Sequence, residues 1–238
     1  NGGKGTVVTS EIEHQAVLKA CEDIERNGIA VTYVKPDTEG VICPKVFTDF
    51  VSDNTKLVSI MYVNNEIGTI EPIKEIGQIA KKHNVVFHTD AVQAVGNIKI
   101  DVDELNIDLL SMSGHKFHGP KGIGALYVRT GIKFDKFMNG GHQERNKRAG
   151  TENVAGIVGM GKAIELAYEN IDEKIKHKEE LREYYFKQVT EKLGFAALTQ
   201  IQAYGNIIKE NNKQMEVRQP SNAKDVKHYT TERLREEF

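Results

Sequence analysis

The chain has 238 residues, of which 39% are hydrophobic and 28% charged, and its formal net charge is −2. This composition is typical of a globular protein, and the length leaves room for one large domain. The balanced charge provides no basic surface for nucleic acid, and no apolar stretch approaches the roughly 20 residues that a membrane span needs. The two cysteines, Cys21 and Cys43, have neither a disulfide nor a zinc spacing, so we expect a reducing cytoplasm and no metal site.

The first residues, NGGKGTVVTS, resemble neither a signal peptide nor a transit peptide, and they do not begin with Met. We therefore expect that the beginning of the chain is cut or processed.

Short β-branched runs alternate with amphipathic helical patterns through the first half of the chain. The runs predict strands at residues 6–9, 30–34, 56–62, 85–88, 109–112 and 124–128. The helical patterns cover residues 15–26, 44–51 and 72–83. Strands separated by helices indicate βαβ units with right-handed crossovers, so we predict an α/β fold with a mostly parallel sheet flanked by helices.

From residue 153 onward the pattern is helical. Residues 153–167 are small and apolar, and residues 175–192 are highly charged, with some Glu and Lys four positions apart. After residue 194 the character changes, because residues 200–214 have no clean period. We therefore predict one domain over residues 1–195 and an unrelated or disordered tail over residues 196–238.

Three polar residues each follow a predicted strand, namely Asn65, Asp90 and Lys116. In doubly wound sheets, ligands bind beyond the carboxyl ends of the strands. We therefore expect these three segments to meet at one mouth of the sheet.

The segment SMSGHKFHGPKG places Lys116 in a glycine-rich turn, and HTDAVQ places Asp90 at the end of the preceding strand. A buried lysine here, accessible yet partly desolvated, suits a Schiff base with pyridoxal phosphate (PLP). The aspartate can keep the pyridine nitrogen protonated. Taken singly, Lys116 could be a surface lysine in a glycine turn, and Asp90 could be a helix cap. Together they favour a PLP site.

Four further residues are candidates for the same site. Gln93 could donate to the phenolic oxygen of the cofactor, and His14, at a strand-to-helix junction, could stack on the ring and move protons. Ser113 and His115 supply a hydroxyl and an imidazole that suit a phosphate. Gln93 could instead be a surface residue and His14 a capping or solvent histidine, and residues 140–156 could bind an anion or form a solvent loop. The histidines that we expect to be structural are His83, His88 and His118.

Five motifs, EHQAV, NNEIGT, HTDAVQAVG, SGHKFHGPKGIGALYVR and RAGTENVAGIVG, occur in this order. Together they resemble the NifS-like, PLP-dependent cysteine desulfurases of the class-V aminotransferase family, above all the branch that serves iron–sulfur cluster assembly. The resemblance runs from Gly5 to Gly194 and implies the large domain of a fold-type-I PLP-dependent transferase. It also implies a homodimer, a sulfur-acceptor scaffold protein, and conversion of L-cysteine to L-alanine with persulfide sulfur left on the enzyme.

The resemblance implies how the ring of PLP is held. Lys116 is the implied catalytic lysine that forms the Schiff base, and Asp90 pairs with the pyridine nitrogen. Gln93 binds the phenolic oxygen, whereas His14 stacks on the ring and takes part in catalysis.

The resemblance also implies contacts to the phosphate and to the substrate. Ser113 and His115 bind the phosphate, and Thr151, in RAGT, reaches the phosphate of the partner subunit across a dimer interface. Asn65 contacts the cofactor and helps to hold the substrate carboxylate.

Several features of the resembled family have no match. Its upstream Gly-Gly-Thr-Glu phosphate loop lies before the start of this chain, and its C-terminal catalytic cysteine and substrate-binding arginine are missing. Cys21 falls on the apolar side of a helix and Cys43 precedes Pro44, so neither lies in a mobile loop that suits a sulfur-carrying nucleophile. We expect a chain truncated at both ends and inactive as a desulfurase on its own.

Residues 215–238 instead resemble the start of 5-keto-4-deoxyuronate isomerase, with Met215 as its start codon. This predicts a desulfurase reading frame that runs into a neighbouring gene, or an assembly artefact. Two other functions fit the motifs: a related class-V PLP lyase or aminotransferase, and a non-catalytic fragment that binds PLP or a partner subunit.

Overall fold

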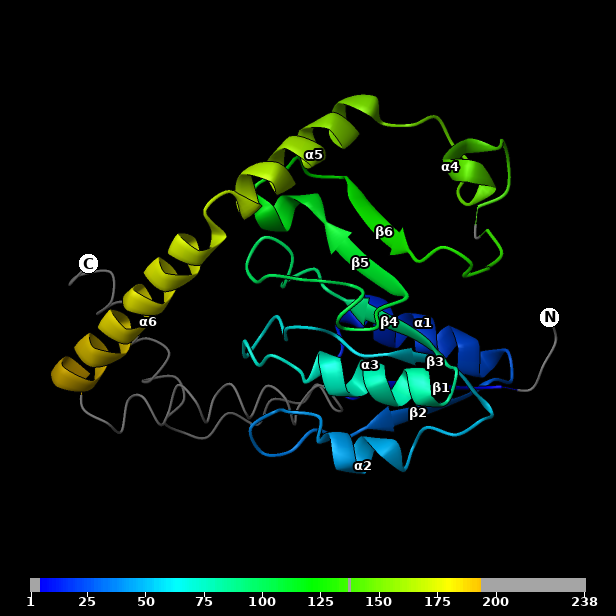
Figure 1. Cartoon of the computed structure of the whole chain (residues 1–238), viewed down its shortest axis with the longest axis horizontal. Coiled ribbons are helices and arrows are strands. Elements are labelled where there is room, and N and C mark those ends of the chain that lie inside the picture. Colours follow the sequence, from blue (N-terminus) through cyan, green and yellow to red (C-terminus); the bar gives the residue numbers. More distant parts are fainter. Residues whose placement is uncertain (1–4, 137, 194–238) are drawn as a thin grey trace, which may run out of the picture. The chain divides into compact units, whose positions relative to one another are not determined.

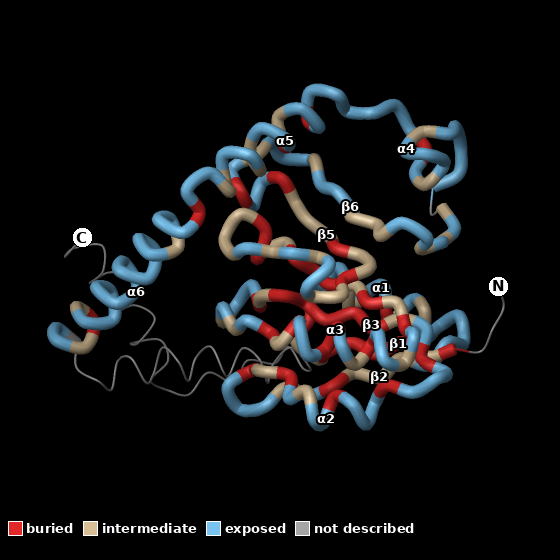
Figure 2. Tube along the Cα trace, viewed as in Figure 1, coloured by how far each residue is buried: buried red, intermediate tan, exposed pale blue. Residues whose placement is uncertain are grey.

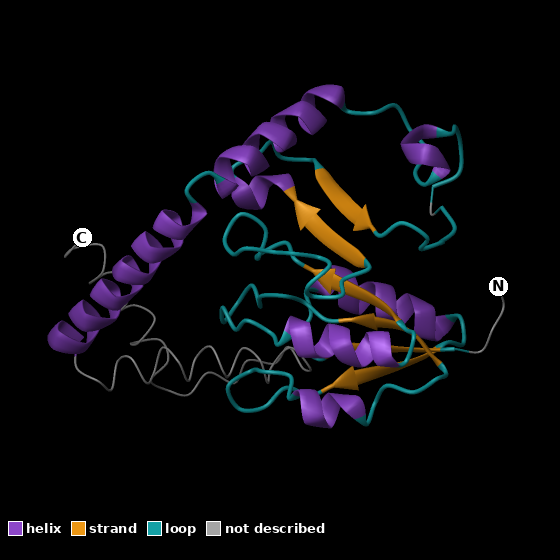
Figure 3. Cartoon of the chain, viewed as in Figure 1, coloured by secondary structure: helices purple, strands orange, loops and turns teal. Residues whose placement is uncertain are grey.

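Six strands form one sheet in the order β2-β1-β3-β4-β5-β6 (Figures 1 and 3) in the computed structural model, which describes residues 5–136 and 138–193. Strands β1 to β5 run parallel to one another, and β6 is antiparallel to β5. The predicted α/β fold with a mostly parallel sheet is confirmed. The strands are β1 (Thr6–Ser10), β2 (Ala30–Val34), β3 (Thr55–Ser59), β4 (Val86–Asp90), β5 (Leu109–Ser113) and β6 (Gly124–Val128).

The helices that connect these strands cover both faces of the sheet. Because β1 leads to β2 in one direction and β3 leads to β4 in the other, right-handed crossovers place α1 and α3 on opposite faces. In Figure 1, α3 lies in front of the strands and α1 behind them. The direction in which the chain adds strands to the sheet reverses between β1 and β3. The helices are α1 (Gln15–Arg26), α2 (Pro44–Thr48), α3 (Ile73–Lys82), the 3₁₀ turn η1 (Gly114–Phe117), α4 (Gln143–Asn146), α5 (Val154–Tyr168) and α6 (Ile171–Leu193).

The apolar core lies between the sheet and the helices α2 and α3. Alternate residues of a strand point to the same face, and Val8, Val58, Phe87 and Leu110 fill this face of four neighbouring strands. Ile76 of α3 is fully buried against the same cluster. In Figure 2 the buried parts of the chain follow these central strands, whereas α5 and α6 are largely exposed.

Most predicted elements occur where the sequence placed them, and the differences lie at their ends. The helix expected at residues 44–51 ends at Thr48, and the strand expected at residues 56–62 ends at Ser59. Even so, the backbone N–H groups of Ile60 and Tyr62 still donate to β4, at 3.1 and 2.9 Å. Helix α4 was not predicted from the sequence, and the left-handed backbone of Glu144 makes it irregular.

The last two helices agree with the helical pattern predicted from residue 153, although α6 begins at Ile171 rather than at residue 175. No helix in the described ranges is long and apolar enough to cross a membrane. The chain divides into two units, Asn1–Tyr184 and Tyr185–Phe238. The predicted boundary at residue 195 and the whole predicted tail lie outside the described residues.

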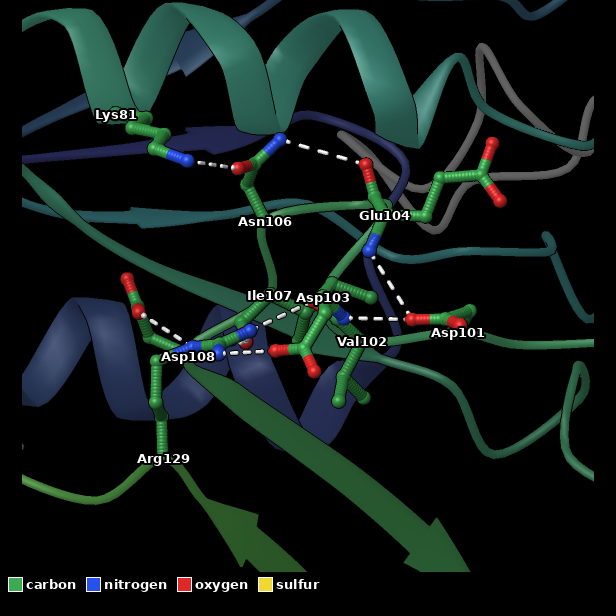
Figure 4. Close-up of polar contacts among 9 residues, drawn as sticks. All are labelled: Lys81, Asp101, Val102, Asp103, Glu104, Asn106, Ile107, Asp108 and Arg129. Atoms are coloured by element: carbon green, nitrogen blue, oxygen red, sulfur yellow. Dashed lines mark hydrogen bonds and ion pairs between the residues drawn. The ribbon is translucent and has the colours of Figure 1, made fainter.

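Arg129, directly after β6, holds the loop that leads into β5 (Figure 4). Its guanidinium donates two hydrogen bonds to the carbonyl oxygen of Ile107, at 3.1 and 2.8 Å, and one to that of Val102, at 2.7 Å. It also pairs with the carboxylates of Asp103 and Asp108. This clamp fixes the entry into β5, the strand whose opposite end carries Lys116.

Candidate cofactor site

Four loops that carry predicted site residues leave the same edge of the sheet. Strands β1, β3, β4 and β5 are adjacent and parallel, so their carboxyl ends meet at one edge. His14 follows β1, Asn65 follows β3, Asp90 ends β4 and Lys116 follows β5. The expected gathering of Asn65, Asp90 and Lys116 at one mouth is therefore confirmed as a matter of topology.

Asp90 is the last residue of β4 and one of the buried acidic residues at this edge. Its side chain is 9% exposed, and one carboxylate oxygen accepts a hydrogen bond of 3.0 Å from the backbone N–H of Val92. Among the described residues this is the only hydrogen bond to the carboxylate, so the other oxygen remains available to a ligand. Gln93 lies in the turn that follows and is half-buried.

A hydrogen-bonded row of three side chains crosses the sheet beside Asp90. Ser59 on β3 contacts His88 Nδ1 at 2.8 Å, and His88 Nε2 contacts Ser111 on β5 at 2.8 Å. Burial lowers the pKa of His88 to about 4, although the charge of Asp90 acts in the opposite direction. A neutral imidazole donates through one nitrogen and accepts through the other, which this row satisfies on both sides.

Lys116 lies in the 3₁₀ turn η1, immediately after β5. Gly114 and Phe117 are buried, and because a 3₁₀ helix repeats every three residues, the residues between them face outward. The expectation of a buried, partly desolvated Lys116 is therefore wrong for this structure, in which the side chain is exposed. The turn is tight, since a Cβ at Gly119 would lie 2.9 Å from the carbonyl oxygen of Gly114.

Ser113, at the start of this turn, and His115, within it, contact each other, with 2.9 Å between Ser113 Oγ and His115 Nδ1. The pair is a compact set of polar groups that suits a phosphate. Thr151 is exposed and lies before α5 rather than on a strand-end loop. Within the described ranges, no hydrogen bond joins its side chain to the other predicted site residues.

His14 is the N-cap of α1, where Nδ1 accepts a hydrogen bond of 3.1 Å from the backbone N–H of Ala16. The capping role considered for this residue is therefore real. It does not exclude a role in the site, because an imidazole that accepts through Nδ1 still presents Nε2 to solvent or ligand.

Two buried polar residues at this edge were missed from the sequence. Glu13 and Asn64 are 5% and 6% exposed, and they directly precede His14 and Asn65. The available signal was the pairing of polar residues in Glu13-His14 and Asn64-Asn65 after strands, where one residue of each pair can turn inward.

The two cysteines differ in their surroundings. Cys21 is 3% exposed within α1, and burial raises the pKa of its thiol to about 11. Cys43 is exposed and precedes α2. The prediction that Cys21 belongs to the core is confirmed, and a thiol with this pKa is almost fully protonated near pH 7.

The groups at this edge fit PLP. A nearly buried carboxylate with one oxygen available suits a pyridine N–H, an exposed primary amine suits a carbonyl carbon, and a hydroxyl-imidazole pair suits a phosphate. These groups lie on β4, on β5 and on the turn after β5, which are neighbours in the sheet.

The chain matches the family model described as Aminotransferase class-V over residues 2–233. It is 54% identical to the cysteine desulfurase IscS of Dictyoglomus turgidum over 187 residues, which cover 79% of this chain and 48% of that protein. The solved structure of a NifS-like protein is 42% identical, with a TM-score of 0.77 over 80% of this chain and 53% of its own. A structure of SspA in complex with cysteine is 47% identical, with a TM-score of 0.67 over 68% and 47%. The chain spans about half the length of the curated relatives it matches.

Proposed function

The chain belongs to the class-V aminotransferase family, and from this premise we propose that it carries the PLP-binding part of a cysteine desulfurase. The reaction would convert L-cysteine to L-alanine and leave persulfide sulfur for iron–sulfur cluster assembly. One observation carries the proposal. Asp90, with a carboxylate oxygen available, ends β4, and Lys116 lies one short turn beyond the neighbouring parallel strand β5.

Each site residue has a part that its surroundings support. PLP, when bound, supplies an electron sink that makes bonds near the amino-acid α carbon labile. Asp90 would accept a hydrogen bond from the protonated pyridine nitrogen, and Lys116 would attach the cofactor through its exposed amine. Gln93, in the turn after Asp90, would donate to the phenolic oxygen. His14 would stack on the ring and move a proton at Nε2, because Nδ1 is held by the cap.

The remaining residues would hold the ends of the bound molecules. Ser113 and His115, already in contact, would bind the phosphate, and Asn65 would hold the substrate carboxylate. Thr151 would contact the phosphate bound to a partner subunit in a homodimer, with a sulfur-acceptor scaffold protein as a further partner. A cytoplasmic location is part of the same proposal, and the free thiols of Cys21 and Cys43 support it.

A second candidate, PLP binding without desulfurase turnover, is favoured by the state of Cys21. A buried thiol with a pKa near 11 is a poor acceptor for sulfur. Alanine released from cysteine above a free-PLP control, and lost in Cys21→Ser or in Cys43→Ser, would contradict this candidate. Faster release of product from L-alanine or L-serine than from L-cysteine would instead favour another class-V lyase or aminotransferase.

Borohydride reduction tests the cofactor assignment directly. The full chain is incubated with PLP, reduced, digested and mapped by mass spectrometry. We expect the adduct on Lys116, lost in Lys116→Ala and retained in Lys121→Ala, which removes an exposed lysine five residues further on and serves as the matched control. An adduct on Lys121 in the unaltered chain would contradict the assignment.

A further inference from the structure

The loops that carry His14 and Asn65 leave the sheet at the point where strand order reverses. The loop after β1 leads into α1 and the loop after β3 leads toward α3, and these helices cover opposite faces. Paired strand residues end at Thr9 and Ser59. Beyond this pair, no strand pairing connects the two loops. The crevice between such diverging loops is where α/β sheets bind ligands.

Two buried side chains connect the loops reciprocally. Glu13, in the loop after β1, accepts a hydrogen bond of 2.8 Å at Oε1 from the backbone N–H of Met61, in the loop after β3. Asn64, in the loop after β3, donates one of 2.9 Å from Nδ2 to the carbonyl oxygen of Ile12. Each side chain thus binds the backbone of the other loop, so the two loops cannot move apart without breaking both bonds.

Each connecting residue also fixes its own loop. Ser10 donates to Glu13 Oε1 at 2.6 Å, which ties Glu13 to the last residue of β1. Asn64 Oδ1 accepts from the backbone N–H groups of Glu66 and Ile67, at 2.9 and 3.1 Å. These bonds close the turn that contains Asn65.

We propose that Glu13 and Asn64 are positioning residues, which hold His14 and Asn65 at a fixed separation across the mouth of the site. The inference rests on the proposed function for the roles of His14 and Asn65. Glu13 and Asn64 act through backbone and need not touch the cofactor, whereas the exposed residues that follow them are free to do so.

The ionisation state of Glu13 agrees with this role. Burial raises the pKa of its carboxyl to about 8; hydrogen bonds from Ser10 and Met61 lower it, and the charges of Asp90 and Glu71 raise it. Glu13 Oε2 is buried and has no hydrogen-bond partner among the described residues, which a neutral carboxyl tolerates better than a carboxylate. Glutamine is therefore the conservative replacement, because its carbonyl oxygen can still accept from Met61.

Substitutions can separate positioning from general stability. Asn64→Asp removes the donor to Ile12 and keeps the acceptor that closes the turn, and Glu13→Ala removes the other connection. Thr9→Val is the matched control, because Thr9 Oγ1 donates to the carbonyl oxygen of Ser59 at 2.9 Å. It is a buried bond between the same two strands, but it lies before the loops begin.

The experiment measures denaturant stability, PLP affinity and the circular dichroism of bound PLP for the full-length variants. We expect all three substitutions to lower stability, but only Asn64→Asp and Glu13→Ala to weaken PLP binding, by about tenfold for one hydrogen bond. The same two should alter the dichroism while borohydride still links PLP to Lys116, and Glu13→Gln should restore affinity.

Three outcomes would overturn the proposal. One is unchanged PLP affinity in both connecting variants, and another is an equal loss of affinity in Thr9→Val. If borohydride links PLP to Lys116 in the unaltered chain, either result contradicts the positioning role and leaves the proposed function intact. If the unaltered chain does not bind PLP at Lys116, both fail together.

Discussion

His88 and Asp90 occupy alternate positions on β4, so their side chains share one face of the sheet. His88 is held on both sides by serines of the neighbouring strands, and one of them, Ser111, is the register partner of Asp90, the residue proposed to bind the pyridine nitrogen. A neutral imidazole at this position adds no positive charge that would compete for Asp90 with the protonated pyridine nitrogen of bound PLP.

We expect His88 to stay neutral down to about pH 4. The pKa of His88 is near 6.5 in the unfolded chain and about 4 in the folded protein, so the unfolded chain takes up the proton first as pH falls. Stability should therefore decline between about pH 6.5 and 4. Nitrogen-15 NMR of the imidazole should show no titration from pH 8 to 5.5. A midpoint near 6.5 would contradict the buried row of hydrogen bonds.

Glu13 should give a pH dependence of the opposite sign. Its pKa is raised to about 8, so the folded chain keeps a proton that the unfolded chain loses near 4.5, and stability falls as pH rises between these values. The Glu13→Gln variant lacks this titrating carboxyl, so the stability of the variant relative to the unaltered chain should increase from pH 5 to 8. Urea unfolding across this range measures the difference, and a pH-independent difference would contradict the raised pKa.

Asp90→Ala should weaken PLP binding more than Gln93→Ala. A charge-assisted hydrogen bond to a pyridinium contributes about 1.5–3 kcal/mol, against about 1 kcal/mol for a neutral one. Fluorescence titration with PLP measures both affinities. Equal losses in the two variants would contradict the roles assigned to these residues.

Gly119→Ala should distort the turn that presents Lys116. The added Cβ would lie 2.9 Å from the backbone oxygen of Gly114, which cannot move without displacing η1. We expect about 1–3 kcal/mol of destabilisation together with reduced PLP capture at Lys116.

The matched control for this change is Gly161→Ala in α5, where an added Cβ meets nothing within 4 Å. A helix-interior Gly→Ala change should stabilise the chain by about 0.5–1 kcal/mol and leave PLP capture unaltered. Normal PLP capture in Gly119→Ala would show that the turn is not needed to present Lys116.

Local sequence determined much of this fold. The helix over Gln15–Arg26 and the strand over Ala30–Val34 have the predicted boundaries, because helical and strand periodicity with clear stop signals are local properties. Alternation of strands and helices also determined the parallel sheet. Because parallel strands have their carboxyl ends at one edge, this alternation also placed Asn65, Asp90 and Lys116 at the same edge of the sheet.

Only the tertiary structure decided how that edge is held. The partners of His88 lie 29 and 23 residues away, on strands whose order in the sheet is not written in any local pattern. From the sequence, Glu13 would be taken for a surface acid. It is buried because its carboxyl group binds the backbone of Met61, which lies 48 residues later in the loop after β3. The antiparallel direction of β6 was likewise not predicted, and it is set by its pairing with β5. Burial and hydrogen bonding between distant segments, rather than periodicity, set the electrostatics of the site.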